Sequence, residues 1–207
     1  METREKRRSA VPGIVRLVAL SLFCGVLVAG CGNSAQSKFE DKLDELFDSL
    51  SEDLEAYAAG DTSEEKASTA TWYEDGQLMM NPDTSLPVDR SMDIISTAKG
   101  IQDHFSYVSL EFLKQDPEDF DDWGESFRER YDARRAEIGL LLDQVKERYR
   151  AHPDDYTSFM FGPTLGLSQD GHLYFRQGST GYYIDEMINI DFDKWFAAVK
   201  EQMRELE

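Results

Sequence analysis

Residues 116–150 read DPEDFDDWGESFRERYDARRAEIGLLLDQVKERYR and decide the fold class of this chain. Asp116 is a suitable N-cap and Pro117 suits the first turn of a helix, because its missing N–H is not needed there. Apolar residues then recur at helical spacing: Phe120, Trp123, Phe127, Tyr131, Ile138, Leu141, Leu142, Val145 and Tyr149. The stretch predicts one long amphipathic helix that ends before Pro153, with a kink at Gly124.

Three further segments show the same period. A helix over 38–59 places Phe39, Leu43, Leu46, Phe47, Leu50, Leu54 and Tyr57 on one face and acidic side chains on the other, and Gly60 ends it. A helix from Ser91 to about 113 contains His104, which we interpret as a core or surface residue and not as a metal ligand. The last helix, over 192–206, begins at the cap Asp191.

Strand-like patterns fill the rest of the chain. Thr69–Tyr73 and Gln77–Met80 flank the turn-like Glu74-Asp75-Gly76, which favours a hairpin. We expect Trp72, Tyr73, Met79 and Met80 of this hairpin in the core, with a binding surface as the alternative. Further strands are predicted over 156–161, 171–176 and 181–190, with Gly162, Gly166 and Gly171 in turns. The fold class is therefore α+β, with several amphipathic helices packed on a small antiparallel sheet.

One carboxylate interrupts the apolar alternation of residues 181–190. Glu186 falls on the face of that predicted strand that is otherwise apolar, and a buried carboxylate needs a partner or a shifted pKa. We expect an edge position exposed to water, with a site residue as the alternative.

The long helix also carries much of the positive charge: Arg128, Arg130, Arg134, Arg135, Lys146, Arg148 and Arg150. Such a patch suits an anionic lipid or an envelope polyanion. Ion pairs with the acidic helix over 38–59 are the alternative that we favour.

The N-terminus has the features of an export signal. The basic residues Arg4, Lys6, Arg7, Arg8 and Arg16 precede the apolar run LVALSLFCGVLVAG at 17–30, which is shorter than the roughly 20 residues of a spanning helix. Val28-Ala29-Gly30-Cys31 resembles the lipobox of bacterial lipoprotein precursors. The resemblance implies cleavage after Gly30 and attachment of diacylglycerol, with acyl chains such as palmitate, to Cys31.

This interpretation divides the chain into a signal peptide at 1–30, a lipidated cysteine and short polar tether at 31–37, and a single extracytoplasmic α+β domain at 38–207. Residues 1–30 hold five basic and two acidic side chains, so without them the formal net charge falls from −19 to about −22. Such an acidic protein is unsuited to nucleic acid, whose phosphates need Lys and Arg. The expected location is the extracytoplasmic face of the cell membrane, with the lipid anchor as the membrane contact.

Known catalytic patterns are missing from the sequence: it has no Gly-x-Ser-x-Gly elbow, His-Glu-x-x-His pair, phosphate loop or Rossmann fingerprint. We therefore predict no catalytic residues, no cofactor and no metal, and the only predicted site residue is the lipid attachment at Cys31. The favoured function is a noncatalytic binding module for an envelope protein, peptide or glycan. The alternative is a carboxylate-dependent hydrolase using Asp170, His172, Asp185 and Glu186.

Overall fold

A computed structural model describes residues 34–115, 117–158 and 162–206. Its helices are α1 (Ala35–Ala59), α2 (Arg90–Ser106), α3 (Leu110–Leu113), α4 (Pro117–Ala151), the 3-10 turn η1 (Pro153–Tyr156), α5 (Ile184–Met187) and α6 (Phe192–Glu205). Its strands are β1 (Ser63–Glu74), β2 (Gln77–Asp89), β3 (Thr157–Ser158), β4 (Gly162–Pro163), β5 (Leu165–Leu167), β6 (Leu173–Gln177) and β7 (Thr180–Tyr182). The α+β fold class is confirmed.

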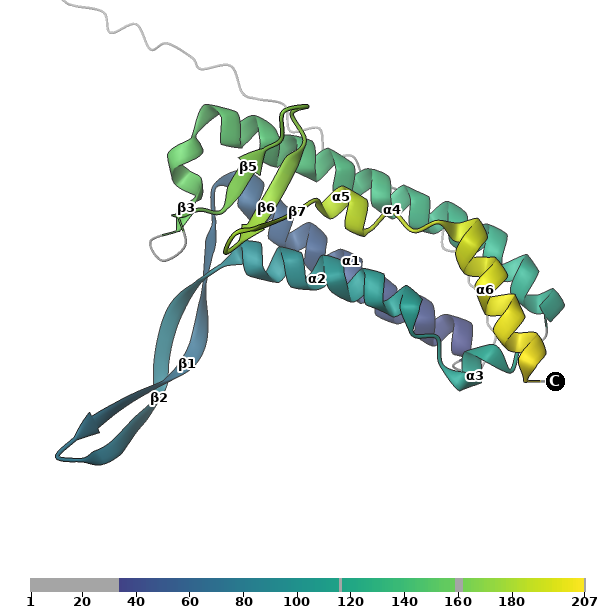
Figure 1. The fold of residues 1–207 in the computed structure, drawn as a ribbon, viewed down its shortest axis with the longest axis horizontal. Helices are drawn as coiled ribbons and strands as arrows, with labels where there is room; N and C mark the ends of the chain where they lie inside the picture. The colour runs from purple at the N-terminus through teal and green to yellow at the C-terminus, as the bar shows by residue number, and fades with distance from the viewer. Residues whose placement is uncertain (1–33, 116, 159–161, 207) are drawn as a thin grey trace, which may run out of the picture. The chain divides into compact units, whose positions relative to one another are not determined.

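The helices meet in an aromatic core. Helix α1 packs along both α2 and α4, and α6 lies against α3 and α4 (Figure 1). Phe39 of α1 stacks on Trp195 of α6 with ring centroids 5.6 Å apart and meets Phe105 of α2 edge-on at 5.5 Å. The ring centroid of Phe127 of α4 lies 5.7 Å from that of Phe39. Burying each such side chain contributes about 1.5 to 3 kcal/mol, so the period of the apolar residues determines which helix faces meet.

A small antiparallel sheet lies at the other end of α1. It has the strand order β5-β6-β7, and Phe175 of β6 lies 5.5 Å from the Tyr57 ring in the last turn of α1. The Tyr57 hydroxyl pairs with the Thr164 hydroxyl at 2.8 Å, and the Tyr156 hydroxyl donates to the carbonyl of Tyr57 at 2.9 Å. These buried hydrogen bonds join the sheet region to the helix end from which the chain leaves toward β1.

The helix limits largely follow the sequence pattern. Helix α4 runs without interruption through Gly124, and α6 begins after Asp191, whose carboxylate accepts a hydrogen bond from the Lys194 N–H at 3.1 Å. Helix α1 ends at Gly60, whose φ of 90° suits a residue without a side chain. It begins at Ala35, earlier than the predicted Lys38, because the Ser34 side chain caps it; residues 35–37 are therefore helical and not part of a tether.

The predicted strand over 181–190 is wrong beyond Tyr182. Residues Ile184–Met187 form α5, and Ile184 and Ile188 are both buried. A spacing of four satisfies a strand period of two and a helical period of 3.6 alike, so the apolar residues did not distinguish the two. Glu186 is exposed, as expected, but it lies on a helix.

Other differences are local. The predicted helix over 91–113 breaks after Ser106, because Ser109 starts α3 by accepting a hydrogen bond from the Phe112 N–H. The predicted strand over 156–161 is reduced to β3, and residues 159–161 lie outside the described residues. Gly166 belongs to β5 and not to a turn, and a side chain there would collide with the ring of Tyr174 on β6. Asp116 also lies outside the described residues.

Candidate interaction site

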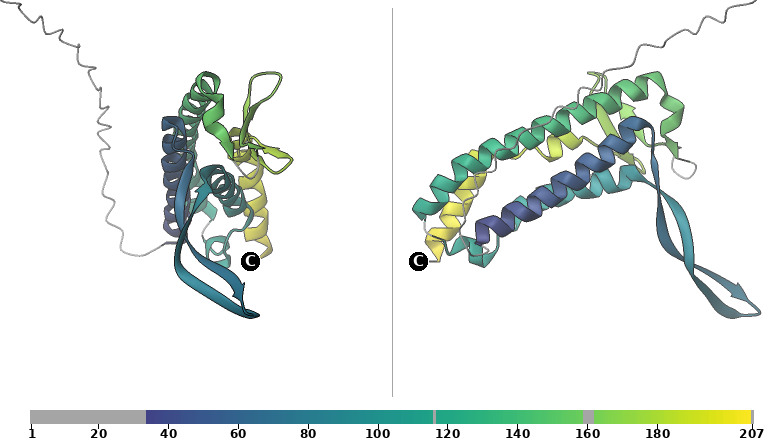
Figure 2. Two further views of the ribbon diagram at one scale, coloured as in Figure 1. Left: turned by 90° about the vertical axis from the view of Figure 1, so that its left-hand side faces the viewer. Right: turned by 180° about the vertical axis from the view of Figure 1, so that it is seen from behind.

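The hairpin of β1 and β2 projects from the helices at the point where α1 ends and α2 begins (Figures 1 and 2). Its turn is Asp75-Gly76, with φ of 49° and 79°, and Glu74 pairs with Gln77 across it. Two positive φ values are typical of a type I′ turn, which matches the twist of two strands. The predicted hairpin is confirmed and is longer than expected, with a register shift between Ser68 and Ala70.

Large apolar side chains are exposed around the end of the hairpin. Tyr73 is 76% exposed, Met80 64%, Leu78 55%, Trp72 45% and Met79 37%. The expectation that Trp72, Tyr73, Met79 and Met80 pack in the core is wrong, because β1 and β2 pair with no other strand among the described residues, and residues 71–81 are exposed on both faces. We call Trp72, Tyr73, Leu78, Met79 and Met80 the hairpin tip.

The hairpin tip is apolar on both faces. Cross-strand partners share a face and neighbours along a strand alternate, so Trp72 and Met79 lie on one face and Tyr73 and Leu78 on the other. A sheet that simply lies on a helix layer has one apolar and one polar face. A hairpin end that is apolar on both faces suits a partner that contacts both faces at once.

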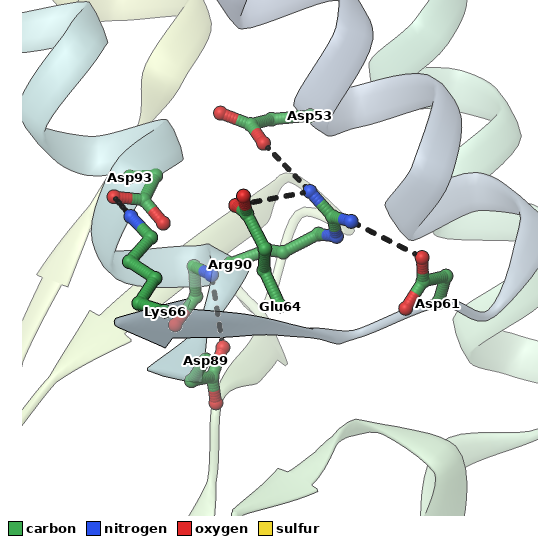
Figure 3. Close-up of polar contacts among 8 residues, drawn as sticks. Asp53, Asp61, Glu64, Lys66, Asp89, Arg90 and Asp93 are labelled. Carbon is green, nitrogen blue, oxygen red and sulfur yellow. Dashed lines mark hydrogen bonds and ion pairs between the residues drawn. The ribbon is translucent and has the colours of Figure 1, made fainter. Parts of the chain in front are cut away.

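An ion-pair cluster fixes the root of the hairpin. The guanidinium of Arg90, at the start of α2, faces three carboxylates: Asp53 of α1, Asp61 of the connecting segment and Glu64 of β1 (Figure 3). The nitrogen to oxygen distances are 3.2 Å, 3.2 Å and 3.5 Å in that order. One partly buried cation therefore joins α1, α2 and β1.

A second ion pair lies beside this cluster. The Lys66 ammonium of β1 donates to Asp93 of α2 at 2.6 Å, and this hydrogen bond raises the pKa of Lys66. Burial raises the pKa of Asp53, and the hydrogen bond from Arg90 opposes that rise. The helix start itself is capped by Asp89, which accepts from the Ser91 N–H at 2.8 Å (Figure 3). The hairpin is thus held at its root while its tip stands free.

The root cluster borders a polar hollow whose lining combines two cations with four carboxylates, from Glu52, Asp53, Glu64, Lys66, Arg90 and Asp93. Nowhere in the described part of the chain do three or more His, Cys, Asp or Glu side chains form a group that suits a metal ion. Because the two cations already pair with Asp53, Glu64 and Asp93, we assign this hollow a structural role.

The predicted hydrolase residues come together only in part. His172 and Asp185 line one hollow beside α4, together with Asp143 and Lys146. Asp170 and Glu186 do not line it. The lining holds no serine, threonine or cysteine, and no hydrogen bond joins the His172 and Asp185 side chains among the described residues.

His104 packs at the edge of the core. Its ring stacks on Phe39 with centroids 4.1 Å apart, and its Nε2 pairs with the Phe39 carbonyl at 2.9 Å. Burial lowers its pKa, which favours the neutral ring.

The basic face of α4 is largely paired within the molecule. Arg130 and Arg134 contact Glu40 and Asp48 of α1, as the sequence predicted. Arg128 pairs instead with Asp193 of α6, and Arg148 with Asp155 beyond the end of α4. An anion-binding patch is therefore not the main use of these arginines.

Sequence reasoning missed the Arg90 cluster, because its members are spread over residues 53 to 90 and share no spacing. Cys31 lies outside the described residues. In the part of the chain that the structure describes, no helix is both long enough and apolar enough to cross a membrane. No family model, curated protein or solved structure matches this chain.

Proposed function

We propose that this chain is a lipid-anchored protein of the bacterial envelope that acts as a noncatalytic interaction module, with the hairpin tip as its binding element. The exposed apolar residues of the tip carry the proposal. Single exposed apolar residues are ordinary, but a contiguous group on a projecting element marks an interaction site. Trp, Tyr and Met are also residue types enriched in protein interfaces.

The anchoring half of the proposal rests on the lipobox-like sequence at 28–31 and the basic, apolar segments before it. Two residues, Gly32 and Asn33, join Cys31 to Ser34, the cap of α1, and the three steps between their Cα atoms span at most about 11 Å. Helix α1 has 25 residues and is therefore roughly 37 Å long. An acylated Cys31 would hold the first turn of α1 close to the bilayer, while the hairpin leaves from the opposite end of that helix.

The charge of the hairpin end favours a polypeptide partner over a lipid surface. Glu74 and Asp75 lie at the apex, so endwise insertion into a bilayer would bring two carboxylates in first. Carboxylates are costly in the apolar layer and are repelled by anionic headgroups. A protein or peptide partner can bind the apolar residues and pair with the apex carboxylates at the same time.

Two experiments test the two halves. When the full sequence is expressed, growth with an alkyne analogue of palmitate should label the protein, and Cys31→Ser should abolish the label; labelling that survives the substitution contradicts the anchor. For the binding half, a photo-crosslinking amino acid at Tyr73 should form adducts in the envelope of the native host. The matched control places it at Tyr107, which is 80% exposed and follows the last turn of α2, whereas the hairpin joins the first turn of that helix. Equal adducts at both sites contradict the proposal.

One observation favours the hydrolase as a second candidate: His172 and Asp185 share the hollow beside α4. A histidine and a carboxylate in one hollow are able to activate a water molecule. The test is hydrolysis of ester, amide and glycoside chromogenic probes by the full chain, with His172→Ala and Asp185→Asn as variants. Turnover lost in both variants supports this candidate, and turnover absent or unchanged by them excludes it.

A further inference from the structure

The two outer edges of the hairpin differ. The β1 and β2 strands form a two-stranded sheet, so each has one edge that pairs with no other strand among the described residues. Strand β2 contains prolines at positions 82 and 87, which have no N–H to donate, whereas β1 contains no proline or glycine. Proline on an edge strand blocks pairing with a further strand. The edge of β1 is therefore the open one.

The register identifies which β1 amides face outward. In an antiparallel ladder, hydrogen-bonded pairs alternate with pairs whose N–H and C=O groups point away from the partner. Counting from the Glu74–Gln77 pair that closes the turn, the Thr71–Met80 pair is of the outward kind. Beyond the register shift, Pro87 has no N–H to donate to its partner Glu65, so we assign the Glu65–Pro87 pair to the outward kind. The Ala67–Ser85 pair lies two positions along the strands and is therefore outward as well. Thr71 and Ser85 thus offer matched outward amides on opposite edges.

The charges along β1 are arranged around an uncharged centre. Residues 67–73 read ASTATWY, rich in strand-forming Thr, Trp and Tyr. Glu65 precedes this run, and Glu74 and Asp75 follow it. The two cations near its start are already paired, Lys66 with Asp93 of α2 and Arg90 with Glu64 of the root cluster. A strand lying along β1 therefore meets negative charge at both of its ends.

We propose that the open edge of β1 binds an extended segment of a partner polypeptide by strand addition. The segment has an uncharged, β-branched or aromatic centre that pairs with residues 67–73 and Lys or Arg near both ends that face the carboxylates. Main-chain hydrogen bonds supply the binding, and Trp72 and Tyr73 cover the two faces of the added strand. This inference rests on the proposed function and names the partner chemistry of the same hairpin.

A second copy of this chain is a poorer occupant of the same edge. Antiparallel pairing of two β1 strands about residue 70 places Glu65 of each opposite Asp75 of the other, and like charges directly opposite are destabilising. The formal charge of about −22 on each copy without residues 1–30 adds repulsion. A basic-ended segment meets neither obstacle.

The test selects peptides from a display library of random twelve-residue sequences on the full chain, purified in detergent. The affinity of each enriched peptide is then measured by fluorescence anisotropy for the unchanged chain, Thr71→Pro and Ser85→Pro. Circular dichroism and the urea midpoint establish that both variants are folded. The expected result is enrichment of peptides with an uncharged centre and basic ends, whose affinity falls at least about tenfold in Thr71→Pro and stays within about twofold in Ser85→Pro.

Several outcomes overturn the inference: no enrichment, peptides without basic ends, or equal effects of the two prolines. A dimer in sedimentation velocity that Thr71→Pro dissociates overturns it in favour of a second copy. A further variant, Tyr73→Ser, separates it from the proposed function. If peptides still bind Thr71→Pro but no longer bind Tyr73→Ser, strand addition is overturned and the hairpin tip remains the binding element. If neither variant changes the affinity, both strand addition and the proposed function of the hairpin tip are contradicted.

Discussion

Replacing Arg90 by methionine tests whether the root of the hairpin depends on one shared cation. The Arg90 side chain is 16% exposed, and its partner Asp53 is 12% exposed. Methionine keeps an unbranched side chain but removes the guanidinium, so Asp53 loses its ion-pair partner while it stays buried. Asp61 and Glu64 are 57% and 44% exposed and can be solvated instead.

The expected loss of unfolding free energy is about 3 kcal/mol. Removing one member of a buried ion pair typically destabilises a protein by roughly 3 to 5 kcal/mol. The lower end applies, because water reaches two of the three carboxylates and Asp53 can take up a proton. Asp53→Asn alone is expected to lose about 1 kcal/mol, since Arg90 keeps two partners. The double variant should lose about 1.5 kcal/mol less than the sum of the two single losses.

Urea unfolding of the full chain at neutral pH, followed by circular dichroism, measures these values. With a slope of about 2 kcal/mol per molar urea, the loss in Arg90→Met lowers the midpoint by about 1.5 M. The matched control is Arg204→Met, whose ion pair with Glu201 is exposed at 70% and 66% and should contribute less than about 0.5 kcal/mol. A loss below about 1 kcal/mol in Arg90→Met, or additive losses in the double variant, shows that the root of the hairpin does not depend on the ion pair between Arg90 and Asp53.

Three more predictions concern the helices, the pH dependence and the tip. Gly139→Ala should raise the unfolding free energy by about 0.5 to 1 kcal/mol, because no neighbouring element lies within 4 Å of the new Cβ. Gly124→Ala should lower the unfolding free energy by about 1 to 3 kcal/mol, because the new Cβ would lie 2.6 Å from the Phe196 ring. The two variants should therefore shift the urea midpoint in opposite directions, and equal shifts contradict this. Burial raises the pKa of Asp53 in the folded state, so the folded chain binds more protons at Asp53 than the unfolded chain does. Protonation of Asp53 should therefore increase the unfolding free energy as the pH falls from the folded pKa toward about 4. The curve of stability against pH should lack this increase in Asp53→Asn. Trp72→Ser should change the thermal stability by less than about 0.5 kcal/mol, because the side chain is 45% exposed, and a larger loss means that the tip packs against the fold.

The sequence predicted the elements that local periodicity specifies. The apolar residues of α1, α4 and α6 recur every three or four positions, and each stripe is buried as expected. The hairpin turn was also predictable, because Asp75-Gly76 suits two positive φ values. Where two periods agree, as at Ile184 and Ile188, the pattern did not separate strand from helix.

The candidate site was only partly predictable. The sequence identified Trp72 and Tyr73 as candidates for a binding surface, but their apolar character favoured a place in the core. Only the fold shows that both side chains are exposed. The Arg90 cluster depends on contacts between α1, α2 and β1, which sequence spacing does not encode. The lipid attachment at Cys31 stays a prediction.

We propose above all that the exposed hairpin tip binds a polypeptide partner at the envelope surface. Photo-crosslinking in the native host from Tyr73, which is 76% exposed, is compared with crosslinking from Tyr107, which is 80% exposed, and each adduct is identified by mass spectrometry. The expected result is a discrete protein adduct from Tyr73 that is absent from Tyr107 and is lost when Trp72 and Met80 are replaced by serine. Adducts of equal yield and identity from both positions, or adducts from Tyr73 that contain only lipid, contradict it.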